Sequence, residues 1–213
     1  MTRTEPTLPH TQCPAKDAPP NAIGLSERSD RLLEAIRLEF PGFEIRPKEG
    51  DILQRAIASA LLAITLGRQR SYLTHYHTVL FGKLYVPESF AKLSDGDRYV
   101  LFMHERVHLR QRKRLGDLAM GFVYLVPLFP LFLAWGRARL EWEAYTATIL
   151  ATAELHGVDA ARALEPEIVR RFVGPDYGWM WPFPAVIRGW FRAVVAELEA
   201  PARPLEKSGP EIT

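Results

Sequence analysis

Residues 99–111 read YVLFMHERVHLRQ, and this stretch places His104, Glu105 and His108 in the spacing H-E-x-x-H. On an α-helix, residues four positions apart lie on one face, so His104 and His108 would direct two imidazoles at one metal ion. Glu105 would lie beside the position that a water occupies in a zinc site with three protein ligands. The spacing therefore predicts a helix that carries two zinc ligands and an acid-base residue.

The residues on either side favour a helix of about five turns. Ser94 and Asp97 form a Ser-x-x-Asp capping box, and Gly116 is a helix stop signal. Apolar and metal-facing positions between them recur with the spacing of one helical face, at Val100, Met103, His104, Val107 and His108. We therefore expect a helix over 97–115. The alternative is a surface helix whose two histidines lie four apart by chance.

Length and composition predict one substantial domain, because 213 residues with 47% hydrophobic and 24% charged residues can bury a core. Residues 1–26 contain five prolines and no apolar periodicity, which predicts a disordered tail. They also lack the apolar stretch of a secretory signal peptide. We expect a single domain over 27–200 and a second disordered tail over 201–213.

Charge and cysteine content exclude several classes of function. The net charge is only +2, so we expect no general affinity for nucleic acid. Cys13 is the only cysteine, which excludes an intrachain disulfide and argues against a cysteine-ligated zinc or a thiol protease. This usage is consistent with a reducing, cytoplasmic compartment.

Hydrophobic periodicity predicts further helices over 29–40, 52–66, 136–156, 162–172 and 187–198. β-branched and aromatic residues predict two short strands, 71–79 and 82–86, and the edge of the strand just before the histidine helix could hold an extended peptide. His75 and His77 would share one face of the first strand, as a second metal pair or, more simply, as polar strand residues. The expected fold is α+β, mostly helical with a small β-sheet.

Residues 118–135 form a run of eighteen residues without a charge, flanked by basic residues on both sides. The length is marginal for a membrane span, but Pro127 and Pro130 would break a helix near its middle, and the basic flanks select no orientation. Three interpretations stay open: a buried core segment, a helical hairpin that dips into a membrane, and a true span.

A catalytic zinc needs a third protein ligand, and the acidic candidates after the histidines are Asp117, Glu141, Glu143 and Glu154. Glu141 and Glu143 lie on the predicted helix 136–156. If Glu141 binds the same ion as the histidines, both ends of the apolar run lie on one side of any bilayer, and the run becomes a hairpin.

The sequence HERVHLRQ, followed by EWEAY at 141–145, resembles the gluzincin zinc metallopeptidases, especially their HtpX-type and CAAX-prenyl-processing branch and related small bacterial proteins. The resemblance covers residues 70–156. It implies that His104, His108 and Glu141 bind zinc and that Glu105 is the general base, with Glu143 as the alternative ligand. Tyr145 stands where that branch has an Asp, and the long membrane helices of the branch are missing.

An aromatic loop at 174–184 contains Tyr177 between Pro175 and Gly178. Tyr177 could donate its hydroxyl to an oxyanion in the site, although a loop that closes the core would have the same composition.

The sequence thus predicts a zinc-dependent metalloendopeptidase that hydrolyses a peptide or protein substrate. It is expected in the cytoplasm, with membrane contact through 118–135 as an open alternative. A non-catalytic zinc-binding or membrane-associated assembly protein is the competing interpretation, and a metal-free helical membrane protein is a third. The substrate, its cleavage specificity and the oligomeric state do not follow from the sequence.

Overall fold

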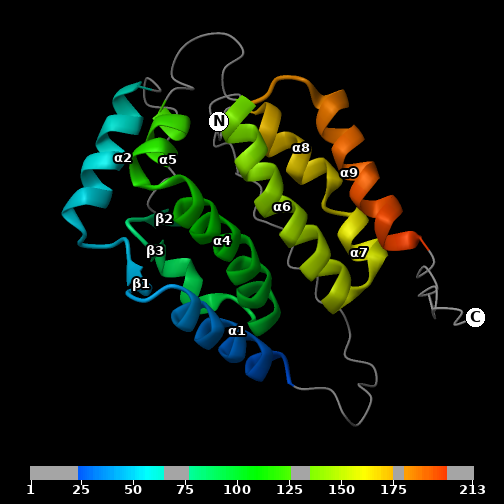
Figure 1. The fold of residues 1–213 in the computed structure, drawn as a ribbon, viewed down its shortest axis with the longest axis horizontal. Coiled ribbons are helices and arrows are strands. Elements are labelled where there is room, and N and C mark those ends of the chain that lie inside the picture. The colour runs from blue at the N-terminus through cyan, green and yellow to red at the C-terminus, as the bar shows by residue number, and fades with distance from the viewer. Residues whose placement is uncertain (1–23, 65–76, 126–134, 175–179, 201–213) are drawn as a thin grey trace, which may run out of the picture.

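The computed structural model describes residues 24–64, 77–125, 135–174 and 180–200, and these residues form helices around one small sheet (Figure 1). The expectation of a mostly helical α+β chain is confirmed. The elements are α1 (Leu25–Glu39), β1 (Glu44–Pro47), α2 (Ile52–Ile64), β2 (Thr78–Leu80), β3 (Lys83–Val86), the 3₁₀ helix η1 (Glu88–Lys92), α4 (Asp95–Leu115), α5 (Asp117–Leu125), α6 (Trp135–His156), α7 (Val158–Arg162), α8 (Glu165–Val173) and α9 (Pro184–Glu199).

The sheet has the strand order β1-β3-β2, with β1 parallel and β2 antiparallel to β3. Phe81 and Gly82 turn the β2–β3 hairpin at φ 50° and φ 76°, so both central residues are left-handed, as a type I′ turn requires. The strand just before α4 is therefore the central one. The expectation that its edge holds a peptide is wrong, because β1 and β2 already pair with both of its edges.

The helix that carries the H-E-x-x-H spacing begins and ends where the sequence predicts, within two residues. The Ser94 hydroxyl accepts the Asp97 backbone N–H at 3.1 Å, which caps the helix, and donates to the Asp97 carboxylate at 2.6 Å. At the other end Gly116 adopts φ 80°, and its N–H donates to the Arg112 carbonyl at 2.8 Å.

Two apolar clusters lie on opposite sides of α4 and α6. The first joins α1, the sheet and α4 through Leu32, Ile36, Phe43, Leu84, Val86, Phe102 and Leu109. The second joins α6 to α7, α8 and α9 through Trp142, Tyr145, Ile149, Ala161, Ile168, Phe172, Ile187 and Phe191, among others. Figure 1 shows α4 and α6 side by side between the two halves. Residues on their facing sides therefore lie at the seam between the two cores.

The apolar run begins with α5 and leads into α6, while 126–134 lie outside the described residues. A Cβ at Gly136 would lie 3.2 Å from Val123 Cγ1, so α5 packs against the first turn of α6. Leu118 and Phe122 are 91% and 68% exposed, which contradicts a fully buried core segment. In the part of the chain that the structure covers, no helix has the length and apolar character needed to cross a bilayer.

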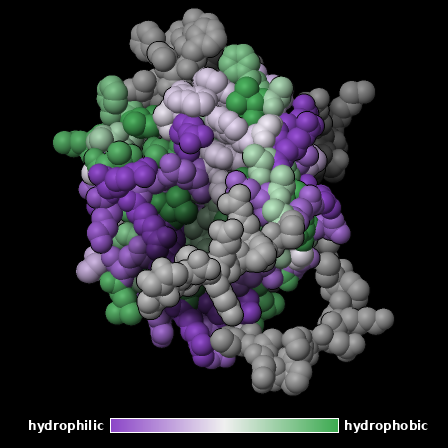
Figure 2. Space-filling view, turned by 45° about the vertical axis from the view of Figure 1, so that its right-hand side comes forward, coloured by the Kyte–Doolittle hydropathy of each residue, from purple (hydrophilic) through white to green (hydrophobic). Residues whose placement is uncertain are grey.

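On the face drawn in Figure 2, hydrophobic and hydrophilic side chains are interspersed.

Three boundaries differ from the sequence prediction. Leu25 and Ser26 belong to α1 and not to the expected tail, whose residues 1–23 lie outside the described ranges, as do 201–213. The single helix expected over 162–172 is two helices, because Pro166 begins α8 in a helical first-turn position. The strand expected over 71–79 is described only from Thr78.

An ion-pair cluster fastens α1 to α4. The Glu39 carboxylate accepts from Arg106 Nε at 2.7 Å and from Arg110 Nε at 2.6 Å. The hydrogen bond from Arg110 is the main cause that lowers the pKa of Glu39 below its ordinary 4.5, with Arg106 adding to it against the effect of burial.

Replacing Glu39 by Gln should lower the free energy of unfolding at pH 7 by about 1 kcal/mol, because two charge-assisted hydrogen bonds are weakened. The folded-state pKa is depressed, so this stabilisation is complete above the ordinary carboxyl pKa and is lost as the pH falls through the lowered value. Urea denaturation of wild type and Glu39→Gln at pH 7 and in more acidic buffers measures it. Glu34→Gln, at an exposed position of α1, is the control, and an equal effect of both substitutions at pH 7 would contradict the prediction.

Candidate metal centre

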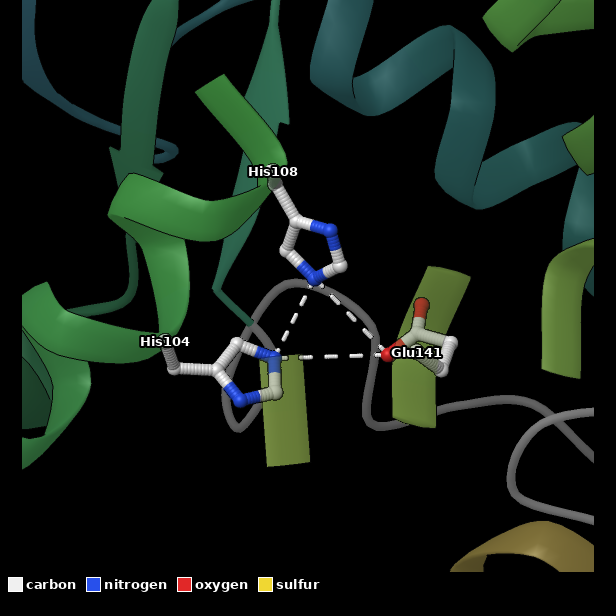
Figure 3. Close-up of side chains that lie close together, drawn as sticks. All are labelled: His104, His108 and Glu141. Carbon is white, nitrogen blue, oxygen red and sulfur yellow. Dashed lines mark hydrogen bonds and ion pairs between the residues drawn. The ribbon is translucent and has the colours of Figure 1, made fainter. Parts of the chain in front are cut away.

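His104 and His108 on α4 point toward Glu141 on α6 (Figure 3). Within the described ranges, these three residues are the group of His, Cys, Asp and Glu side chains that could hold a metal ion. The two Nε2 atoms lie 3.2 Å apart, and Glu141 Oε2 lies 4.0 Å from His104 Nε2 and 3.8 Å from His108 Nε2.

This triangle fits a small cation. A triangle with sides of 3.2, 3.8 and 4.0 Å has a point about 2.1 Å from all three corners, which is the usual distance of zinc from nitrogen and oxygen ligands. A slight approach of the carboxylate would allow a tetrahedral arrangement with a fourth position open. The three residues can therefore hold a metal ion.

The hydrogen bonds of Gln111 determine which nitrogen of His108 carries the proton. Gln111 Nε2 donates to the Leu140 carbonyl at 2.8 Å and to Glu143 Oε2 at 2.9 Å, and both partners can only accept. The amide oxygen of Gln111 therefore faces His108 Nδ1, at 2.9 Å. Nδ1 must donate, so the Nε2 lone pair of His108 is directed at the site.

His104 has the same tautomer for an independent reason. Its Nδ1 lies 3.0 Å from Thr148 Oγ1, and the Thr148 hydroxyl donates its proton to the Ala144 carbonyl at 3.4 Å, so the hydroxyl oxygen accepts from Nδ1. Nδ1 therefore carries the proton, and Nε2 presents a lone pair. Burial, and then the neighbouring His108, hold the pKa of His104 well below 6.5, which keeps the ring neutral as a ligand must be.

With both rings neutral in these tautomers, the two Nε2 lone pairs face each other at 3.2 Å. Two acceptors at this distance repel, and a cation that both coordinate removes the repulsion. The donor set and its hydrogen bonds are therefore compatible with a metal ion held between the rings.

Glu105 is buried on the same helix, next to His104. Burial raises the pKa of its carboxyl group to about 7, and the negative charge of Glu141 adds to this, whereas His108 and Lys48 oppose it.

Lys48 supplies a second buried charge near Glu105. The side chain is 1% exposed, and its Nζ donates to Thr78 Oγ1 at 2.8 Å. Burial lowers the pKa of Lys48 to about 8, while the charge of Glu105 acts in the opposite direction. The ammonium group therefore favours the ionised form of Glu105, and the carboxylate favours the charged form of Lys48.

His77 does not belong to the metal group. Its ring packs edge-on against Phe90 with centroids 6.1 Å apart, and burial, followed by the charges of Lys48 and Arg171, lowers its pKa to about 4. His77 Nε2 is buried without a hydrogen-bond partner in the structure. His75 lies outside the described residues, so the second metal pair remains a prediction.

The structure separates the four acidic ligand candidates. Glu141 joins the histidines, whereas the Glu143 carboxylate accepts from Gln111 and lies 3.6 Å from Arg114. The two others form ion pairs elsewhere, Asp117 with Arg112 and Glu154 with Arg28.

Three residues of the site were not predicted as site residues: Gln111, Thr148 and Lys48. Gln111 follows His108 by three positions, and Thr148 follows Glu141 by seven, so helical spacing could have indicated both. Lys48 has no such signal, because it reaches the site from the loop after β1. Tyr145 packs edge-on against the His104 ring with centroids 4.9 Å apart, and Tyr177 lies outside the described residues, so its role remains a prediction.

The chain was compared with protein-family models, curated proteins and solved structures. None of them matches. A function is therefore inferred from the residues of the site and their geometry.

Purified protein should contain one divalent metal ion per chain, since three ligand atoms converge on one point. We expect elemental analysis to show that His108→Ala and Glu141→Gln lose the metal, because each removes one ligand atom. Glu143→Gln is the matched control and should keep the metal, because it removes no ligand atom and its amide oxygen can still accept from Gln111. Equal metal loss in Glu143→Gln and Glu141→Gln would contradict the assignment of the third ligand.

Proposed function

We propose that the protein is a zinc-dependent metallopeptidase whose active site is the group His104, His108 and Glu141. The observation that carries the proposal is the convergence of two imidazoles and one carboxylate beside the buried Glu105. Two histidines and one acidic residue with an open fourth position are typical of catalytic zinc in peptidases. The resemblance of the H-E-x-x-H helix to gluzincins points the same way.

Glu105 is the general base in this proposal. When bound, zinc acts as a Lewis acid and lowers the pKa of a coordinated water to about 7. The Glu105 carboxylate accepts the proton of the attacking water and delivers it to the nitrogen of the leaving amine. Lys48 supports this role, because its ammonium group favours the ionised carboxylate before each cycle.

An extended peptide substrate would be held along β2 in this proposal. In the described residues β2 pairs on one side with β3, and it packs against α4, the helix of the two histidines. Main-chain hydrogen bonds to an edge strand give affinity without demanding one sequence. His77 Nε2, buried just before β2, has no hydrogen-bond partner among the described residues, so it is a polar atom that a bound substrate could satisfy.

A non-catalytic zinc-binding protein is the second candidate. The observation that favours it is the burial of the ligands, since the Glu141 and His108 side chains are only 6% and 9% exposed. Structural zinc sites are closed, whereas catalytic ones keep one position accessible. Membrane contact through the exposed apolar side of α5 is part of this alternative.

Glu105→Gln should abolish hydrolysis and leave metal content unchanged. The substitution removes the proton acceptor but no ligand atom, so we expect kcat to fall by about 10²–10⁴-fold. The rate of hydrolysis is measured by mass spectrometry, with a mixture of peptides whose ends are free or blocked. Elemental analysis of the same samples measures the metal content.

Glu197→Gln, on the exposed side of α9, is the control for the carboxylate-to-amide change and should retain full activity. Zinc-loaded wild type that cleaves no peptide, or cleavage that persists in Glu105→Gln, would argue for the non-catalytic candidate.

A further inference from the structure

We infer that Gln111 is the positioning residue for His108 and that Glu143 in turn orients Gln111. The inference rests on the metal site of the proposed function and adds two residues to it. Neither residue contacts the three ligand atoms, and each acts through its neighbour.

The first step is the orientation of the Gln111 amide. A glutamine amide can rotate by 180° and exchange its donor and its acceptor. Here the nitrogen has two acceptors, the Leu140 carbonyl at 2.8 Å and Glu143 Oε2 at 2.9 Å. The reversed amide would turn its oxygen toward both of them, so Glu143 and the α6 backbone exclude that state.

The second step is the imidazole of His108. With the amide fixed, its oxygen accepts from Nδ1–H at 2.9 Å and sets both the tautomer and the rotation of the ring. Gln111 is 2% exposed, so water does not replace this contact. Nε2 is thereby held as an acceptor toward Glu141 before any metal arrives.

The relay also explains the position of the third ligand. Glu141 and Leu140 are neighbours on α6, and the Leu140 carbonyl is one of the two acceptors of Gln111. The same amide that orients His108 therefore fixes α6 against α4 at the residue before Glu141. One side chain sets the relative position of two ligands that come from different helices.

The outer end of the relay reaches the surface. Gln111 and Glu143 line a groove between α4 and α6, together with Val107, Arg110 and Arg114. Arg114 lies 3.6 Å from Glu143, in a long and exposed ion pair. Glu143 is thus accessible to substitution without disturbing the buried core.

Gln111→Leu tests the relay in two ways. In the metal-free protein, long-range ¹⁵N NMR of the imidazoles should show Nδ1–H for His108 in wild type and a shift to Nε2–H in the variant. Zinc affinity, measured by competition with a chelator, should fall by about 10–100-fold, the usual effect of removing such a contact. Unchanged affinity together with an unchanged tautomer would overturn the inference.

The double variant Gln111→Glu/Glu143→Gln exchanges the amide and the carboxylate at nearly constant volume and charge. The amide nitrogen at position 143 can donate to the carboxylate at position 111. That carboxylate still accepts the proton of His108 Nδ1. We expect Gln111→Glu alone to bind zinc weakly, because it places two carboxylates side by side and also turns an oxygen toward the Leu140 carbonyl. The double variant removes the first of these two repulsions, so it should bind zinc more tightly than Gln111→Glu. A double variant as weak as Gln111→Glu would overturn the relay, and it remains informative if Gln111→Leu fails to fold.

Arg114→Gln is the control, because it changes the charge of the same groove and leaves in place the hydrogen-bond partners of the Gln111 amide, which are His108, Leu140 and Glu143. It should leave zinc affinity unchanged, and a loss equal to that of Gln111→Leu would attribute the effect to surface charge and overturn the inference. Zinc binding without hydrolysis in wild type would remove the proposed peptidase and leave the relay intact. The NMR experiment uses metal-free protein, so it tests the relay even in a chain that takes up no zinc.

Discussion

The interaction on which the site depends is a repulsive one. Two imidazole nitrogens, each with its lone pair forward, are held 3.2 Å apart next to a carboxylate inside the protein. Such an arrangement costs free energy unless a cation lies between the groups, so the surrounding structure must maintain it. It does so with two hydrogen-bonded side chains behind the rings, Thr148 and Gln111, and with an apolar cluster on each side of the α4–α6 seam.

Local features of the site were predictable because short sequence motifs determine them. The capping box at Ser94, the stop at Gly116 and the i, i+4 histidines define α4 and its metal-facing side. The choice between Glu141 and Glu143 was not predictable in this way. Two positions on a helix differ by about 200°, so the ligand depends on how α6 is rotated against α4, and that is a property of tertiary packing.

Long-range pairing accounts for the other differences from the sequence prediction. The parallel partner β1 lies far from β3 in sequence. Because β1 pairs with β3, the strand expected at the edge of the sheet is the central one. In α2, Leu53 is 42% exposed, whereas the neighbouring polar Gln54 is fully buried. Helical periodicity identifies a face, but the orientation of that face depends on partners that periodicity does not reveal.

The position of the ligands on two helices has a consequence for the apolar run between them. A metal ion bound by His108 and Glu141 would act as a cross-link that closes the chain segment containing α5 and the residues up to α6. An ion that binds only the folded state stabilises it by an amount that grows with the logarithm of the metal concentration, once that concentration exceeds Kd. Metal occupancy and the attachment of α5 to α6 would then be thermodynamically coupled, so that removing the ion would weaken the attachment of a helix whose apolar side chains are exposed.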